Sequence, residues 1–191
     1  KLSATQIKAL SVAQVAAIET ADLAKFNTEQ IAALSAAQVK GMGTDQIKAL
    51  STDQVKGLQD AQIKALSTDQ IKQLGTAQIA ALETSQIKSL TAAQLSSMGT
   101  DQIAAIETAD LAQLSAAQLK GLTTAQIAGL STTQVEKLSA TQIKALSTAQ
   151  VAAIETADLA KFSTEQIAAL SAAQVKGMST DQIKALSTDQ V

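Results

Sequence analysis

Residues 66–81 read LSTDQIKQLGTAQIAA, which is two successive copies of an eight-residue unit. This octad runs from Leu2 to Val191 without an insertion or deletion, and we label its positions a to h. Position a, as at Leu66, is apolar in every octad, and position f, as at Ile71, is always Ile, Val or Leu. Such regularity is typical of repeat architectures, in which each unit buries its apolar face against its neighbours.

The spacing of the apolar positions indicates helices that are broken at every octad. Positions a and f alternate at intervals of five and three residues, which fits neither a strand nor a heptad. In one continuous helix, eight residues would advance by about 800°, or two turns plus about 80°. The apolar stripe would then circle the helix and could not face a single core.

The octad also carries the signals of a helix start. Position b is Ser, Thr, Asn or Gly in 19 of 24 octads, and these are preferred N-cap residues. Position e is Gln in 21 of 24 octads, which completes a capping box, while positions a and f are the partners of a hydrophobic staple. Because an isolated helix this short is unstable in water, stacking must stabilise it. The sequence therefore predicts an all-α solenoid of very short capped helices, one per octad.

Charged residues follow the same register. All 15 Lys residues lie at g or h, near the predicted helix end, and 16 of the 17 acidic residues lie at b to e, near its start. The helix dipole favours this arrangement. Position h is mostly Ala, Gly or Ser, which predicts close approach of the next unit.

Four octads depart from the cap pattern because Glu occupies position b, and three of these also replace the Gln at e by Asp. The residues concerned are Glu19, Glu83, Glu107 and Glu155 at b, and Asp22, Asp110 and Asp158 at e. The Thr that follows each Glu is expected to take over the cap one residue later, so we interpret these octads as register adjustments or slight bends. The alternative, a Ca²⁺ site at Glu19 and Asp22, lacks the roughly six to eight converging oxygens that Ca²⁺ requires.

The chain is organised as a single continuous array, residues 1–191, of about 24 octads. It begins at position h and ends at position f, both within an octad, so we expect an excerpt from a longer array. Residues 1–55 recur at 137–191 with three changes, at Val12/Thr148, Asn27/Ser163 and Gly43/Ser179. Near-identity at surface as well as core positions indicates growth by duplication of a long block.

The composition excludes most kinds of active site. His, Cys, Trp, Tyr, Arg and Pro are absent, so catalytic triads, thiol nucleophiles and His or Cys zinc sites cannot form. A net charge of −2, without Arg or stacking aromatics, argues against nucleic-acid binding. No apolar run approaches the roughly 20 residues of a membrane span. We therefore predict no enzyme activity, no catalytic or metal-binding residue, no cofactor, and neither nucleic-acid binding nor membrane insertion.

Two rows of polar side chains remain. Because Gln both donates and accepts hydrogen bonds, the Gln row at e is expected to cap helices locally and to bridge neighbouring units. Thr occupies position c in 16 of 24 octads, and a regular Thr row is the basis of a more remote alternative, binding to ice or another crystal surface. Ala36, Ala92 and Ala116 interrupt this row in the sequence.

The run LSTDQIK at residues 66–72 resembles the LSTxQIxAL repeat tracts of very large repetitive bacterial surface or secreted proteins, often described as adhesin-like or haem-utilisation-like. The resemblance extends over the whole chain and implies a cell-surface or secreted location. Haem use is not supported here, since only the thioethers of Met42, Met98 and Met178 could ligate iron.

These observations predict a non-enzymatic spacer or stalk within a large bacterial surface or secreted protein. Its partners would be the neighbouring repeats of the same array. The alternative is a binding module for adhesion, which would engage a protein or glycan partner through the solenoid surface.

Overall fold

The computed structural model describes residues 2–191, and within this range the chain forms 23 short α-helices and no β-strand. They fall into two compact units, Lys1–Met98 and Gly99–Val191. The first contains α1 (Ala4–Ala9), α2 (Val12–Ala16), α3 (Thr20–Leu23), α4 (Thr28–Ala32), α5 (Ala36–Lys40), α6 (Thr44–Lys48), α7 (Thr52–Lys56), α8 (Asp60–Ala65), α9 (Thr68–Ile71), α10 (Thr76–Ala80), α11 (Thr84–Ser89) and α12 (Ala92–Ser97). The second contains α13 (Thr100–Ala104), α14 (Thr108–Leu111), α15 (Ala116–Lys120), α16 (Thr124–Ala128), α17 (Thr132–Glu136), α18 (Ala140–Ala145), α19 (Thr148–Ala152), α20 (Thr156–Leu159), α21 (Thr164–Ala168), α22 (Ala172–Lys176) and α23 (Thr180–Lys184).

Each helix begins after position b, and wherever Ser, Thr, Asn or Gly occupies that position it is the predicted cap residue. Ser67 has an extended backbone (φ −69°, ψ 163°), and its hydroxyl accepts from the Gln70 N–H at 3.1 Å while the Gln70 side chain accepts from the Ser67 N–H at 2.8 Å. Where Gly is the cap residue, as at Gly43, only the Gln half of the box is made, at 2.8 Å. The capping box predicted from the octad is therefore confirmed, in full at Ser, Thr and Asn caps and by half at Gly.

Each helix ends because the next octad begins. The residue at position a leaves the helical region, as Leu66 does (φ −56°, ψ 135°), and its N–H donates to the Ile63 carbonyl at 3.2 Å. No residue in the described range has a positive φ. The chain therefore turns without the left-handed residue that usually favours Gly after a helix, and this explains why position h accepts Ala, Ser, Lys and Gln as well as Gly.

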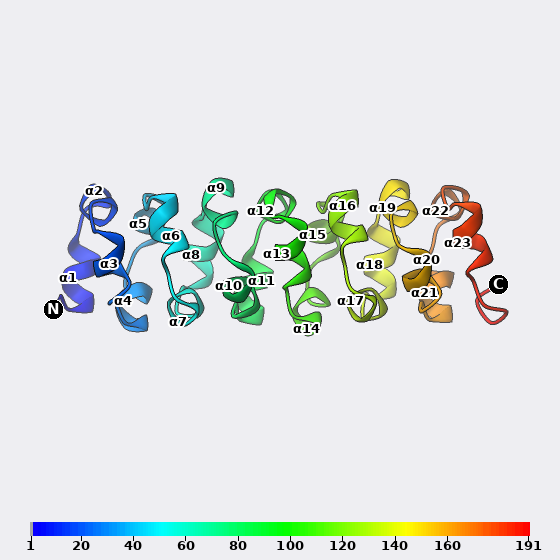
Figure 1. Ribbon diagram of the computed structural model, residues 1–191, viewed down its shortest axis with the longest axis horizontal. Helices are drawn as coiled ribbons and strands as arrows, with labels where there is room; N and C mark the ends of the chain where they lie inside the picture. The colour runs from blue at the N-terminus through cyan, green and yellow to red at the C-terminus, as the bar shows by residue number, and fades with distance from the viewer. Residues whose placement is uncertain (1) are drawn as a thin grey trace. The chain divides into compact units, whose positions relative to one another are not determined.

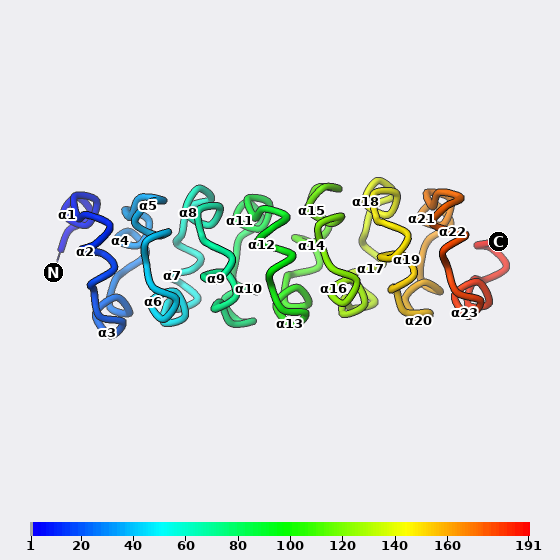
Figure 2. Tube along the Cα trace, turned by 90° about the horizontal axis from the view of Figure 1, so that it is seen from above, coloured from blue at the N-terminus to red at the C-terminus, as the bar shows by residue number. Residues whose placement is uncertain are grey.

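Three octads make one turn of the solenoid within each unit. Within each unit, a helix packs on the third helix before or after it, so a turn contains 24 residues and the helices line up in columns. Figures 1 and 2 show this winding from two directions. The columns of the first unit are α1–α4–α7–α10, α2–α5–α8–α11 and α3–α6–α9–α12, and those of the second are α13–α16–α19–α22, α14–α17–α20–α23 and α15–α18–α21.

The side chains at positions a and f form the core, as the sequence predicts. In the first unit, Ile47, Ile63 and Ile71 at position f are fully buried, and Leu58 and Leu66 at position a are nearly so. A helix of four to six residues contains only one such side chain, at position f, because position a lies between helices. The apolar burial that stabilises it therefore comes from neighbouring helices and turns.

The Glu octads keep the common register, so the expectation that Thr takes over the cap is wrong. Glu19 remains the N-cap residue of α3 with an extended backbone (φ −65°, ψ 145°), although its side chain makes no capping hydrogen bond. The Leu23 N–H donates to the Glu19 carbonyl at 3.0 Å, so the backbone closes the first turn unaided. Register is kept because the apolar residues on either side, Ile18 and Leu23, retain their fixed spacing.

Candidate functional site

The recurrent polar site of this molecule is the Gln at position e, whose two ends have different partners. Gln70 Oε1 accepts from the Ser67 N–H, and Gln70 Nε2 donates to the carbonyls of Val39 and Met42 at 3.0 and 2.8 Å. Val39 lies in the last turn of α5, and Met42 follows that helix. Helix ends leave such carbonyls without intrahelical partners. One side chain thus serves the start of its own helix and the end of a helix one solenoid turn earlier.

This Gln bridge recurs along both units. Of the carbonyls of the residues 31 and 28 positions earlier, Gln78 and Gln134 reach only the one 28 earlier, whereas in most octads the bridge reaches both. It is made by Gln38, Gln46, Gln54, Gln62, Gln70, Gln86, Gln94, Gln142, Gln150, Gln166, Gln174, Gln182 and Gln190. Within the described residues, no buried side-chain nitrogen or oxygen lacks a hydrogen-bond partner. The prediction that Gln caps its own helix and bridges octads of neighbouring turns is confirmed.

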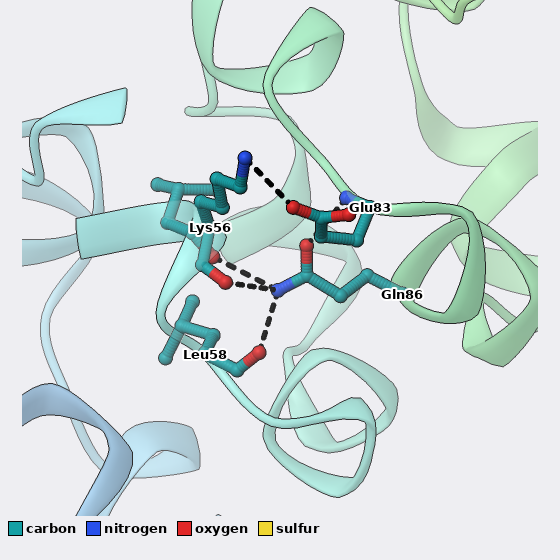
Figure 3. A network of polar contacts seen from close by, with 5 residues as sticks. Lys56, Leu58, Glu83 and Gln86 are labelled. Atoms are coloured by element: carbon teal, nitrogen blue, oxygen red, sulfur yellow. Dashed lines mark hydrogen bonds and ion pairs between the residues drawn. The ribbon is translucent and has the colours of Figure 1, made fainter. Parts of the chain in front are cut away.

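Figure 3 shows a Gln bridge with an ion pair beside it. Gln86 Nε2 donates to the carbonyls of Val55, Lys56 and Leu58, and Lys56 Nζ lies 2.8 Å from a Glu83 carboxylate oxygen. The hydrogen bond and the negative charge of Glu83 raise the pKa of Lys56 above its ordinary value of 10.5. Both side chains are more than half exposed, so the pair contributes little to stability. The two residues are 27 apart, and only knowledge of the 24-residue turn would reveal them as neighbours.

Replacing Gln by Asp reverses the direction of hydrogen bonding across the turn. Asp158 is buried and accepts from Thr132 Oγ1 at 2.6 Å, 26 residues earlier. Asp22 is exposed and contacts Lys25 Nζ within its own octad at 3.1 Å. No group of three or more His, Cys, Asp or Glu residues in the described range is placed to hold a metal ion. Asp22 and Glu19 therefore gain no further carboxylate ligand there.

The Thr side chains at position c line individual columns of helices. Thr28, Thr52 and Thr76 are exposed on α4, α7 and α10, which pack in consecutive turns. Ala36 and Ala92, which interrupt the row in the sequence, lie on α5 and α12 in the other two columns of this unit. Position c also meets position h of the next turn, since a Cβ added at Gly57 would lie 3.1 Å from Thr28 Cβ. The structure thus brings together a continuous row that the sequence presents as interrupted.

One hollow in the described part of the chain is shallow and carries little chemistry. It has a volume of about 580 Å³ and lies in the first unit, where small residues and Gln side chains line it. Lys8 is the only charged residue at its edge. General acid–base chemistry needs titratable groups held near one another at the reacting atom, and this hollow does not supply them.

The octad pattern of this chain matches a known repeat family. The model of the ALTTAQ repeat matches residues 15–52, 47–76, 71–105, 103–140 and 151–188. No match was found among the curated proteins compared with the chain. Within residues 2–191, none of the helices has the length and apolar character needed to span a bilayer. The five matches cover most of the sequence, and the chain therefore belongs to the ALTTAQ repeat family.

Proposed function

We propose that this array is a non-enzymatic structural spacer, a stalk that holds other parts of a polypeptide at a set distance. The observation that carries the proposal is the use of the recurrent polar side chains. The Ser at b caps its own helix, and the Gln at e joins two turns through both of its polar ends. The residue types that define the octad are thus engaged in building the solenoid, and they leave no cluster of reactive groups for catalysis.

The length of such a spacer increases with the number of its turns. Helices that pack on one another lie about 8–10 Å apart, so each 24-residue turn adds about that length within a unit. Contacts run from one turn to the next, as in other repeat arrays, so turns can be added without redesign of the rest. The near-identity of residues 1–55 and 137–191 supports lengthening by duplication. The resemblance to repetitive bacterial surface and secreted proteins supports placing this stalk on or outside a bacterial cell.

The spacer proposal is tested by changing the number of turns in the first unit. The chain contains no Cys, so Thr5→Cys and Ser85→Cys give two unique sites for fluorescent labels. Deleting residues 34–57 removes one turn and keeps the octad register, and energy transfer should report a distance shorter by about 8–10 Å. Replacing residues 34–57 with a copy of 58–81 is the matched control and should leave the distance unchanged. A distance that ignores the deletion would refute the spacer proposal.

The uninterrupted Thr row of the α4–α7–α10 column supports a second candidate, a binding face for a glycan or a protein. Hydroxyl and methyl groups repeat there once per turn on exposed positions. The triple change of Thr28, Thr52 and Thr76 to Val keeps the shape and removes the hydroxyls. If this row binds a glycan, the unchanged chain should be captured on a glycan array, and the triple variant should not. The α3–α6–α9 column carries an equivalent exposed row, Thr20, Thr44 and Thr68, so the same change there distinguishes a partner of one column from a partner of any Thr row.

A further inference from the structure

The Gln bridge drawn in Figure 3 recurs eight octads later with different charges around it. In Figure 3, Gln86 Nε2 donates to the Lys56 carbonyl at 3.3 Å. Gln150 Nε2 donates to the Lys120 carbonyl at the same distance, 3.3 Å. Each lysine is the last residue of its helix, α7 or α15. The backbone of Lys120 is therefore held by the next turn of the solenoid as the backbone of Lys56 is.

The acidic partner of the lysine is missing at the second of these places. Lys56 Nζ lies 2.8 Å from a carboxylate oxygen of Glu83, which follows it by 27 positions. At the same spacing from Lys120 the sequence has Ser147. A turn after Lys120, 24 positions along the chain, it also has Lys144, where the first place has an Ala. Two positive charges and a hydroxyl thus replace a single ion pair.

Both lysines line one hollow of the second unit. Lys120 lies on α15 and Lys144 on α18, and these two helices pack on each other in consecutive turns. The hollow has a volume of about 480 Å³, and three Ala side chains, Leu146 and Ser147 complete its lining. Sites for small ligands have roughly 300–1,000 Å³. Both lysines are exposed, and within residues 2–191 neither takes part in an ion pair, so both charges can face a ligand.

The first unit contains the same residue types with one acidic residue added. Lys40, Lys64 and Ser67 have the spacing of the two lysines and the serine of the hollow. However, Asp60 lies one helical turn before Lys64, and its carboxylate accepts from Ser85 Oγ at 2.9 Å. The equivalent residue of the second unit is an Ala. Because a carboxylate on the protein repels an anionic ligand, the hollow of the second unit is the more favourable place for one.

Backbone groups around this hollow are already engaged. Gln150 Oε1 accepts from the Ser147 N–H at 2.8 Å, and Gln150 Nε2 donates to the Lys120 carbonyl. Gln174 Nε2 donates to the Leu146 carbonyl at 2.8 Å. A peptide that pairs through its main chain finds these groups occupied. Recognition therefore falls to side chains, and the Ser147 hydroxyl, which accepts from the Gln150 N–H at 3.1 Å, keeps its own hydrogen to donate.

From these observations we propose that the hollow between Lys120 and Lys144 binds a carboxylate-bearing sugar unit of an acidic glycan. The carboxylate takes the place that the Glu83 carboxylate has beside Lys56, the sugar ring lies on the Ala methyl groups, and a sugar oxygen accepts from the Ser147 hydroxyl. Because both ammonium groups are exposed, one such unit binds weakly and added salt weakens it further. This site goes beyond the spacer role, since neither lysine affects the number of turns.

Fluorescence titration with a single label tests the proposal. The chain contains no Cys, so Thr141→Cys places one environment-sensitive label a helical turn before Lys144. A short oligogalacturonate should change the emission and reach saturation, and its methyl ester, which lacks the negative charges, should not. Lys120→Gln combined with Lys144→Gln should raise the dissociation constant by about tenfold. Lys137→Gln combined with Lys161→Gln removes the same charge from exposed residues outside the hollow and should bind like the labelled parent.

Ser147→Glu gives a second test that keeps both lysines. It places a carboxylate 27 positions after Lys120, as Glu83 is placed after Lys56, so it should fill the site and weaken binding by about tenfold. Ser131→Glu also replaces a cap hydroxyl, but the residue 27 positions before it is an Ala, so its binding should be unchanged.

Three results would overturn the proposal: equal binding of the methyl ester, unchanged binding by the variant that lacks both lysines of the hollow, or equal effects of the two Ser→Glu changes. An oligoglutamate that binds as tightly as the oligogalacturonate would overturn the assignment to a sugar. None of these results bears on the distance measurement that tests the spacer.

Discussion

Residues 34–55 and 170–191 differ only at Gly43 and Ser179, yet the two segments have different burial. Their helices have matching bounds, Ala36–Lys40 with Ala172–Lys176 and Thr44–Lys48 with Thr180–Lys184. Their caps match as well, since the Ser35 and Ser171 hydroxyls accept at 3.1 and 3.2 Å. The cover differs most at position f and less at position a, where Met42 is buried and Met178 is half-buried. The octad therefore specifies the helix, and the following turn supplies the burial.

The comparison also shows that the stacking has a direction. Gln38 and Gln174 are both buried, because each donates to the turn before it, and both segments have a preceding turn. At the other end of the duplication the relation is inverted, and Gln14 is exposed where Gln150 is buried. A turn thus needs its predecessor for the Gln bridge and its successor to cover position f.

The largest difference in stability between the two segments is expected when a charge is placed at position f in each. Ile47→Asp buries a carboxylate in the core and should lower the free energy of unfolding by about 4 kcal/mol or more. Ile183→Asp places the same group on a half-exposed site and should cost less than about 1 kcal/mol. Thermal unfolding followed by circular dichroism at a dilute concentration measures both. Equal losses would mean that the neighbouring turn does not protect position f.

The next largest difference in stability is expected between a Gln that makes the cross-turn bridge and one that does not. Gln150→Glu keeps the cap acceptor but removes the donors to the Leu119 and Leu122 carbonyls, now at 3.1 and 2.8 Å, and should cost about 2–3 kcal/mol. Gln14→Glu loses no cross-turn bond and places a carboxylate at the N-terminal end of α2, where the helix dipole favours it. Its free energy of unfolding should change by less than about 0.5 kcal/mol. Urea titration of both variants checks the difference, and similar midpoints would count against a directional bridge.

Position h lies close to position c of the previous turn. We therefore expect a Gly→Ala change at position h to destabilise the chain in one segment and to stabilise it in the other. A Cβ at Gly41 would lie 2.1 Å from Val12 Cγ1, whereas at Gly177 the nearest contacts are at 3.4 Å. Gly41→Ala should destabilise by about 1 kcal/mol. Gly177→Ala should stabilise by about 0.5 kcal/mol, since the backbone there (φ −82°, ψ −8°) suits Ala. Adding Val12→Thr, the residue found at 148, should remove the penalty of Gly41→Ala, and persistence of the penalty would contradict the contact.

The smallest effect is expected at the position where the two segments differ. Gly43→Ser copies the Ser179 cap, whose hydroxyl accepts from the Gln182 N–H at 3.1 Å. The change should stabilise the chain by a few tenths of a kcal/mol, roughly the difference between Ser and Gly as N-cap residues. Denaturant midpoints measured in parallel with Ser179→Gly, which should show the reverse shift, sharpen this comparison. Midpoint shifts of the same sign in both variants would show that the cap hydroxyl does not account for the change in stability.

Local structure is predictable from the sequence because its causes lie within one octad. Ser67, Gln70 and Ile71 specify the cap, the capping box and the buried face, and the structure contains all three. Three octads per turn is not predictable, because the partners of Gln70 at Val39 and Met42 look like every other octad in the sequence. The cap at Glu19 was mispredicted for a related reason, since the spacing of the buried residues outweighs side-chain capping preference.

Hydrogen exchange at a dilute protein concentration tests most directly whether turns, rather than octads, stabilise this fold. Peptides that contain residue 43 or 179 differ in mass, yet the amides around them have nearly the same intrinsic exchange rates because the surrounding sequences are identical. We predict that amides in α6 exchange about tenfold or more slowly than the corresponding amides in α23, since within residues 2–191 a following turn packs on α6 and none packs on α23. Equal protection of the two helices would contradict the account.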